Sequence, residues 1–89
     1  MKRILTTGRF EKDVKLAIGR GLEQERLWVL VEQLARGRQL APRYRPHRLG
    51  GEWRNCSECH IAPDWLLVWR EDEPQLILLR TGSHSDLFG

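Results

Sequence analysis

Apolar residues in the first part of the chain recur at the spacing of two amphipathic helices. The first set falls at i, i+4, i+7 and i+8, one face of a helix, and consists of Phe10, Val14, Ala17 and Ile18. The second set also shares one helical face and consists of Leu27, Leu30, Val31 and Leu34. Gly19-Arg20-Gly21 ends the first helix and Gly37 the second, because glycine is favoured where a helix stops. Each helix has a single apolar side, so the sequence predicts a helical hairpin that packs against another layer.

The remaining segments show the shorter repeats of β-strands. The predicted strands are residues 2–7, a short strand near Trp53, and residues 56–61, 64–70 and 75–81. Residues 64–70 are apolar on both faces, which is typical of a central strand. In the last strand Leu76, Leu78 and Arg80 share one face, and the polar residues 71–74 join it to the preceding strand as a hairpin turn.

The order of these elements predicts an α+β fold in which the helices lie on one face of a sheet. An N-terminal strand comes first, the two-helix hairpin follows, and three or four antiparallel strands complete the sheet. The chain has 89 residues, so residues 1–89 are expected to form a single domain near the lower end of what folds alone. No apolar run approaches the roughly 20 residues of a membrane span, and Met1-Lys2-Arg3-Ile4 lacks the apolar region of a signal peptide. We therefore expect a cytoplasmic protein without a membrane partner.

Cys56 and Cys59 are the two cysteines of the chain and precede His60 in the spacing C-x-x-C-H. This is the attachment pattern of c-type haem. Haem attachment belongs to exported proteins, however, and the chain has too few apolar residues to enclose a haem. A zinc site that adds His47 is chemically possible, but in a strand Cys59 and His60 point to opposite faces. The favoured interpretation is that both thiols are reduced and that Cys59 is a small buried hydrophobe.

Basic residues are concentrated in the first part of the chain. Residues 1–54 hold thirteen Lys and Arg against six Asp and Glu, whereas residues 55–89 hold two against six. Residues 36–54 alone hold six arginines and one acidic residue, Glu52. Arginine binds phosphate through two parallel hydrogen bonds, so this segment is a candidate nucleic-acid contact. The alternative is an ordinary solvated face.

Histidine occurs only three times, and each copy stands in a polar motif. The three residues are His47, His60 and His84. An imidazole with its ordinary pKa of about 6.5 exchanges protons near neutral pH. Neighbouring strand ends are expected to bring the polar motifs to one edge of the sheet. A lone histidine is more often a hydrogen-bonding group than a catalyst. Three of them beside Asp64, Glu58 and Arg80 indicate metal-free acid–base chemistry on an anion.

RNA cleavage by the ribose 2′-hydroxyl is the reaction that such a set would serve. One group removes the hydroxyl proton, a second protonates the departing 5′-oxygen, and an arginine stabilises the crowded phosphorane. The reaction needs no metal and no cofactor. Phe88 offers a ring on which a base can stack; the alternative is that it fills the core at the C-terminus.

Three segments resemble YafQ-type toxins, which belong to the RelE-like group of bacterial toxin–antitoxin modules. The segments are Tyr44 to Trp53, Glu58-Cys59-His60-Ile61-Ala62-Pro63-Asp64-Trp65, and Arg80-Thr81-Gly82-Ser83-His84 through Leu87-Phe88. The likeness covers nearly the whole chain, and the patterns H-x-x-P-D-W and R-T-G-S-H-x-x-L-F are specific. It implies the RelE-like fold and a type II toxin that enters the A site of the 70S ribosome and cuts mRNA. The products would carry a 2′,3′-cyclic phosphate and a 5′-hydroxyl.

The same resemblance assigns roles to residues. The positions that match the catalytic set are His47, His60, Asp64 and His84. The positions that match supporting or RNA-binding residues are Glu58, Trp65, Arg80 and Phe88. His84 is expected to handle a proton at the scissile phosphate, with His60 and Asp64 sharing the partner role. Arg80 is expected to bind phosphate, and His47 to orient the substrate.

The partners are also implied by the resemblance. A free mRNA-cutting toxin is harmful, so a cognate antitoxin of the RelB/DinJ kind is expected to wrap it, on the helical hairpin or over the active-site groove. Operator DNA is expected to be bound only by the toxin–antitoxin complex, mostly through the antitoxin. Within the basic segment, Arg43 and Arg45 are expected to meet rRNA or mRNA phosphates.

Two positions depart from the family pattern. Pro46 stands where an aspartate often precedes the first histidine, and Ser57 stands where an arginine is frequent. Without a basic group at position 57, phosphate binding would be weaker unless Arg43 or Arg54 replaces it. One alternative is therefore a catalytically weak or dead relative that acts with its antitoxin as a transcriptional co-repressor, although the histidines are retained. A ParE-like gyrase poison generally lacks these histidines, and a small metal-binding module would use the cysteines.

Overall fold

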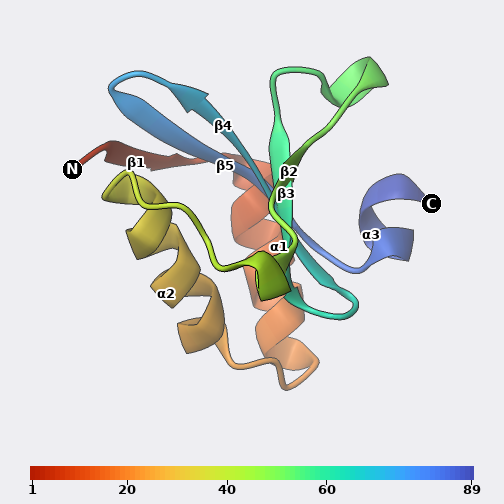
Figure 1. Ribbon diagram of the computed structural model, residues 1–89. Coiled ribbons are helices and arrows are strands. Elements are labelled where there is room, and N and C mark those ends of the chain that lie inside the picture. The colour runs from red at the N-terminus through yellow and green to blue at the C-terminus, as the bar shows by residue number, and fades with distance from the viewer.

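The computed structural model describes residues 1–89 (Figure 1). In chain order its elements are β1 (Arg3–Thr6), α1 (Gly8–Gly19), α2 (Gln24–Ala35), β2 (His47–Arg48), β3 (Ser57–Ala62), β4 (Trp65–Asp72), β5 (Gln75–Gly82) and α3 (His84–Phe88). Two short 3₁₀ turns flank β2: η1 (Pro42–Tyr44) and η2 (Gly51–Trp53). The α+β class and the helical hairpin, formed by α1 and α2, are confirmed. None of the helices has the length and apolarity that crossing a membrane requires.

The strands form one sheet in the order β1-β5-β4-β3-β2. Neighbouring strands pair antiparallel except β1, which runs parallel to β5 and sets Ile4 opposite Leu76. The predicted N-terminal strand is confirmed as β1, and the three or four antiparallel strands predicted after the hairpin are confirmed as the four strands β2 to β5. The partner of β1 and its parallel direction were not predicted. Apolar periodicity identifies a strand but not its partner, and β1 pairs with the strand furthest from it in the sequence.

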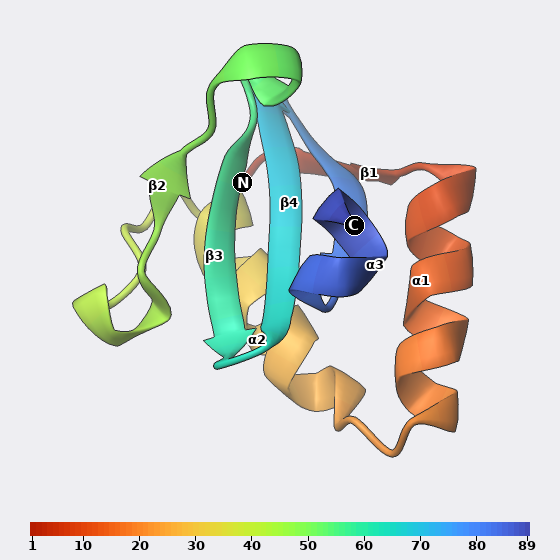
Figure 2. The same cartoon turned by 90° about the vertical axis from the view of Figure 1, so that its right-hand side faces the viewer.

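The helices α1 and α2 cover one face of the sheet, and α2 lies behind β3 and β4 in the view of Figure 2. The buried cluster on this face consists of Phe10, Ala17, Leu27, Leu30, Val31, Leu34, Ala35, Leu40, Cys59, Ile61, Trp65, Leu67, Trp69, Leu76 and Leu78. Thr7 begins α1, since its side-chain oxygen accepts a hydrogen bond from the backbone N–H of Phe10 at 3.0 Å. The same hydroxyl donates to the carbonyl oxygen of Leu79 at 3.0 Å. The start of α1 is thereby fixed to β5.

A smaller buried cluster lies on the opposite face, where α3 packs in front of the sheet (Figure 2). Its members are Cys56, Leu66, Val68 and Leu87, and Trp53 packs against them. This layer adds a helix that was not predicted and corrects one prediction. The two predicted helices share one face of the sheet, and residues 84–88 form α3 on the other face. The short strand near Trp53 is instead β2, and Trp53 lies in the turn η2, where Gly51 adopts a φ of 62° that glycine tolerates well.

The two cysteines are buried in different clusters. Cys59 lies among the residues under α1 and α2, and Cys56 lies in the cluster under α3. Burial, with a smaller effect of the nearby Glu58 carboxylate, raises the pKa of the Cys59 thiol to about 12. The thiol is therefore protonated and unreactive at neutral pH, and the interpretation of Cys59 as a small buried hydrophobe is confirmed. Because the two sulfurs face opposite sides of the sheet, they cannot hold the same haem or metal ion.

Candidate active site

Three elements bring the histidines together on the α3 side of the sheet. His47 lies in β2, His60 in β3, and His84 is the first residue of α3. The ring centres of His47 and His60 are 6.5 Å apart, and those of His60 and His84 are 5.6 Å apart. The rings form a series with His60 in the middle, hereafter the histidine row. The expected convergence of the polar motifs at one place on the sheet is thus observed for these residues.

Asp64 fixes the orientation of His84. It lies in the turn between β3 and β4, and its Oδ1 accepts hydrogen bonds from the backbone N–H of His84 at 3.0 Å and from the imidazole Nδ1 at 3.0 Å. The donated backbone N–H is the main cause, and the imidazole the next, of an Asp64 pKa below its ordinary value of 3.8. An ionised carboxylate only accepts, so Nδ1 of His84 carries hydrogen. Its Nε2 makes no hydrogen bond within the protein and is available to a ligand.

His47 has both ring nitrogens engaged. Nδ1 lies 2.8 Å from the carbonyl oxygen of Arg45, and Nε2 lies 3.2 Å from Oε1 of Glu58. A carbonyl only accepts, so Nδ1 carries hydrogen, and Nε2 faces the Glu58 carboxyl. The Glu58 side chain is only 6% exposed, and its Oε2 has no hydrogen-bond partner. His47 is therefore held between β3 and its own loop.

His60 is the least restrained member of the row. Its only hydrogen-bond contact is from Nδ1 to the carbonyl oxygen of Pro63, at 3.4 Å, near the long limit for such a bond. No carboxylate contacts the ring. His60 and His84 are consequently the two neighbouring imidazoles that both present a free Nε2.

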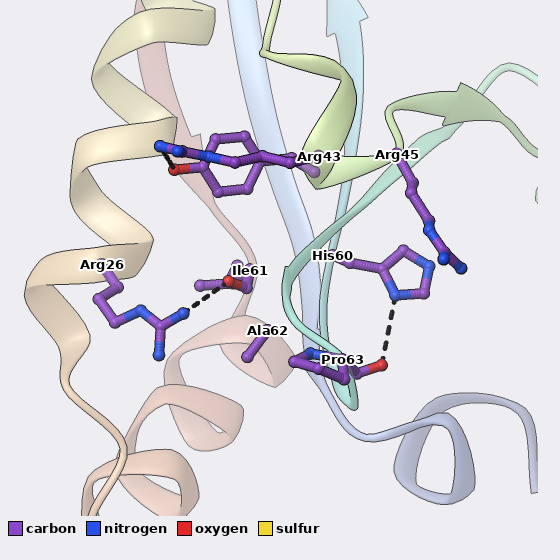
Figure 3. Close-up of a pocket in the computed structure, with 8 residues that line it drawn as sticks. Arg26, Arg43, Arg45, His60, Ile61, Ala62 and Pro63 are labelled. Carbon is purple, nitrogen blue, oxygen red and sulfur yellow. Dashed lines mark hydrogen bonds between the residues drawn. The ribbon is translucent and has the colours of Figure 1, made fainter.

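A cavity of about 470 Å³ opens beside the row and shares His60 with it (Figure 3). Its lining residues are Arg26, Arg43, Tyr44, Arg45, His60, Ile61, Ala62 and Pro63. Arg26 Nη2 donates to the carbonyl oxygen of Ile61 at 3.0 Å, while Arg43 donates to the Tyr44 hydroxyl at 2.8 Å. The Arg45 side chain makes no hydrogen bond or ion pair and extends past the His60 ring in Figure 3. The wall next to the row is thus basic and has one uncommitted guanidinium.

A family model described as bacterial toxin of type II toxin-antitoxin system, YafQ, matches residues 2–89. This chain belongs to the YafQ family. The mRNA interferase toxin YafQ of Escherichia coli (strain K12) is 36% identical to it over 84 residues, which are 93% of this chain and 91% of that protein. The crystal structure of YafQ from E. coli strain BL21(DE3) has a TM-score of 0.94 at 33% identity and covers 100% of both chains. The crystal structure of the E. coli DinJ–YafQ complex has a TM-score of 0.92 at 34% identity, and the match again covers 100% of both chains.

The resemblance inferred from the three motifs is confirmed by these matches, and the RelE-like α+β fold with it. Arg80 of this YafQ family member is nevertheless not directed at the histidine row. Its Nε and Nη2 donate to the carboxylate of Asp13 in α1 at 2.7 and 3.2 Å, and each of the two side chains is 12% exposed. The backbone N–H of Thr81 donates to the same carboxylate at 3.2 Å. The guanidinium expected to bind phosphate is therefore engaged within the protein, whereas that of Arg45 is not.

Two further residues assigned to RNA contact are buried. Trp65 is 2% exposed, and its Nε1 donates to the Thr81 hydroxyl at 2.9 Å. Direct contact of Trp65 with RNA is excluded by this burial, and the residue supports the site from the core. Glu58 is 4% exposed and reaches the row only through His47. Phe88, by contrast, is 44% exposed and lies edge-on to Trp53 with ring centres 5.6 Å apart, so it does not fill the core. The residue of α3 that is buried is Leu87.

Several residues of the site were not predicted from the sequence. Arg26 lines the cavity from α2, far from the polar motifs in sequence, and nothing in its neighbourhood distinguishes it from other helix-surface arginines. Tyr44 stands within the first recognised motif, and an aromatic residue between two arginines is a signal of a nucleic-acid contact that the sequence does carry. The partner of Arg80, Asp13, carried no such signal.

Proposed function

We propose that this YafQ family member is an mRNA interferase, a toxin that cleaves mRNA on the ribosome by metal-free acid–base catalysis. The observation that carries the proposal is the adjacent pair His60 and His84, with free Nε2 atoms and ring centres 5.6 Å apart. Two imidazoles so placed can serve the attacking and the leaving oxygen of one phosphodiester. The name of the E. coli relative, mRNA interferase toxin YafQ, supports the choice of substrate.

The two imidazoles differ in their surroundings, and this difference assigns their roles. The ionised Asp64 carboxylate at 3.0 Å stabilises a protonated His84, so His84 is proposed as the general acid that protonates the 5′-oxygen. His60 has no carboxylate partner and is proposed as the general base that removes the proton of the 2′-hydroxyl. The 2′-oxygen then bonds to phosphorus as the bond from phosphorus to the 5′-oxygen breaks. The products are a 2′,3′-cyclic phosphate and a 5′-hydroxyl.

The remaining members of the site bind and orient the RNA. Arg45 is the uncommitted cation beside His60 and is proposed to pair with a phosphate oxygen, where charge accumulates in the transition state. His47, held by Glu58, fixes the loop that carries Arg45. Phe88 offers its exposed ring for stacking on a base. RNA would thus lie across the histidine row, with its basic contacts on the side of the cavity.

We further propose that the partners are the 70S ribosome with mRNA in its A site, and a cognate RelB/DinJ-like antitoxin. The E. coli relative has been solved in complex with DinJ, which supports an antitoxin of that type for this chain. Operator DNA would be bound by the toxin–antitoxin complex rather than by the toxin alone. The proposed site of action is the cytoplasm, where translating ribosomes are found.

The test is primer extension on a defined mRNA in a purified translation system, with and without ribosomes. The proposal expects cuts that appear only with ribosomes, fall within the A-site codon, and leave a 5′-hydroxyl on the downstream fragment. His84→Ala should abolish them while retaining the antitoxin complex. A folded parent protein that gives no cut in either condition would overturn the nuclease proposal and leave the co-repressor function.

A further inference from the structure

The helix that carries His84 is too short to hold its own position. α3 spans five residues, with His84 first and Phe88 last. Even much longer isolated helices are unstable in water, because the free energy lost in ordering the first turn exceeds what the hydrogen bonds of one turn contribute. The placement of His84 beside His60 therefore depends on contacts made by α3 with the rest of the protein. Leu87 supplies one at the far end of the helix, where it is buried in the smaller cluster.

The first turn of α3 is closed by a capping box. The Ser83 hydroxyl oxygen accepts from the backbone N–H of Asp86 at 3.1 Å, and the Asp86 carboxylate accepts from the backbone N–H of Ser83 at 2.9 Å. The preceding residue fits closely against this box: a Cβ atom added to Gly82 would lie 2.9 Å from Oδ2 of Asp86. Asp86 is thus held at a fixed point two residues after the one that carries the imidazole.

Arg20 ties this turn to the helical hairpin. It is the residue at which α1 ends, and its backbone N–H remains bonded to the last turn of that helix. Nη1 donates to Oδ2 of Asp86 at 2.6 Å and Nη2 donates to Oδ1 at 3.2 Å, a two-pronged ion pair. The pairing with Arg20 is the main cause of an Asp86 pKa far below its ordinary value, so the carboxylate is ionised throughout the neutral range.

We propose that Arg20 and Asp86 are positioning residues for His84: their ion pair sets the first turn of α3 so that the His84 imidazole faces His60. The inference rests on the proposed function, because the catalytic role of His84 is itself proposed. Asp64 accepts from the backbone N–H and from the ring Nδ1 of His84, and Leu87 anchors the end of the helix. The link to Arg20 adds a third point of attachment, on the side chain of the third residue of the helix. It joins the first turn of α3 to the end of α1, which the other two contacts do not reach.

A positioning role differs from a purely structural one in what it changes. The Arg20 side chain is 45% exposed, and exposed ion pairs typically contribute little to global stability. Removing it should therefore leave the urea unfolding midpoint close to that of the parent. Misplacement of a catalytic group by about 1 Å, in contrast, can cost up to about 100-fold in rate. The expected effect is thus on the rate of cleavage at saturating ribosome and on the His84 ring, not on folding or on ribosome affinity.

The test uses full-length Arg20→Gln, Asp86→Asn, the double variant and Arg20→Lys, with Arg36→Gln as the matched control. Arg36, the residue that caps the end of α2, makes a comparable exposed ion pair with Glu32 of the same helix. Asp86→Asn keeps the shape and an acceptor oxygen for Ser83, so it removes the charge without deleting the cap. Two readouts are needed: single-turnover cleavage on saturating mRNA-programmed ribosomes, and the NMR resonances of the His84 imidazole in the free protein.

Arg20→Gln and Asp86→Asn should each slow cleavage by about 3- to 30-fold, and the double variant no more than either one. Arg20→Lys should recover part of the rate. The His84 resonances should move in the first three variants and stay in place in Arg36→Gln. Rates within about twofold of the parent, unmoved His84 resonances, or an equal effect of Arg36→Gln would overturn the proposal. A parent protein that cleaves nothing defeats the proposed function instead, and the NMR comparison then still decides whether the ion pair positions His84.

Discussion

Asp13→Ala should destabilise the protein far more than an exposed aspartate would, because it leaves the Arg80 guanidinium without its partner. Asp13 accepts three hydrogen bonds: from Nε and Nη2 of Arg80 at 2.7 and 3.2 Å, and from the backbone N–H of Thr81 at 3.2 Å. The pairing with Asp13 raises the pKa of Arg80. Because the ordinary pKa of arginine already lies far above neutral pH, the guanidinium remains charged when the carboxylate is removed. The substitution therefore strands a cation between α1 and β5.

The size of the effect follows from the burial of the pair. Removing one partner of a fully buried ion pair costs about 3–5 kcal/mol, most of it the penalty of an unpaired charge. Both side chains here are 12% exposed, so water reaches the guanidinium at one edge. We therefore expect the free energy of unfolding to fall by about 2–3 kcal/mol. Glu11→Ala, on the same helix but exposed, should cost no more than about 0.5 kcal/mol.

Urea unfolding followed by tryptophan fluorescence measures both values. Asp13→Ala combined with Arg80→Met should be less costly than the sum of the two single changes by at least about 1 kcal/mol, since it removes the stranded charge. The same variants decide what Arg80 does. A loss below about 0.5 kcal/mol for Asp13→Ala, together with a stable Arg80→Met that no longer cleaves mRNA, would refute the structural role and return Arg80 to phosphate binding.

Three further expectations concern the site and the core. Arg45→Ala should weaken ribosome binding by about tenfold at low salt and lower the slope of affinity against salt by about one phosphate contact, as measured by the half-saturating ribosome concentration over a range of salt concentrations. Arg9→Ala, which changes an exposed arginine on α1, should leave the affinity and the slope unchanged. Equal effects of the two substitutions would contradict a specific contact of Arg45. The lowered pKa of Asp64 means that this carboxyl is ionised at every pH above its ordinary 3.8 and loses its charge only below that value. Any change of the cleavage rate with pH near neutrality therefore belongs to another group. Asp64→Asn should slow single-turnover cleavage by about tenfold or more, because it removes the charge beside the His84 imidazole, and an unchanged rate would remove Asp64 from the support of His84. Cys59→Ser should lower the free energy of unfolding by about 1–3 kcal/mol because it buries an unpaired hydroxyl. This loss should exceed that of Cys59→Ala, and both variants should still cleave mRNA. A Ser variant as stable in urea as the Ala variant would contradict an apolar environment.

The spacing of apolar residues was sufficient to predict the helices α1 and α2, whose buried faces depend only on residues close together in the sequence. The apolar faces of α1 and α2 depend only on the 3.6-residue period, and they bury the residues that the period selects, such as Leu27 and Leu30. The partner of β1 is not encoded in that way, because it is chosen by contacts between the two ends of the chain. α3 is shorter than the window in which helical periodicity can be recognised, and its signal was the cap residue Ser83 followed by Asp86.

For the site, the sequence showed which residues carry chemistry but not all of their directions. Strand alternation placed Arg80 on the same face as Leu76 and Leu78, and these two leucines do meet the helices in the structure. A register shift in the β4–β5 pair intervenes before Arg80, which lies opposite Val68, a member of the cluster under α3. Alternation therefore did not determine the direction of the Arg80 side chain, which is set by its ion pair with Asp13. Asp13, 67 residues away from Arg80, was beyond this type of reasoning.

Two carboxylates contact two imidazoles in this site, and the difference between these contacts is the basis on which the proposed mechanism assigns roles to the histidines. Glu58 is buried with Oε2 unpartnered, and its Oε1 lies 3.2 Å from Nε2 of His47. His47, bonded through both nitrogens, has none left for a substrate. The Asp64 side chain is 69% exposed and contacts only Nδ1 of the His84 ring. It orients the imidazole and stabilises its protonated form while Nε2 stays open. The proposed mechanism therefore gives proton transfer to His84 and its neighbour His60, and orientation to His47. The reason is that the Asp64 carboxylate leaves Nε2 of His84 open, whereas the Glu58 carboxylate occupies Nε2 of His47.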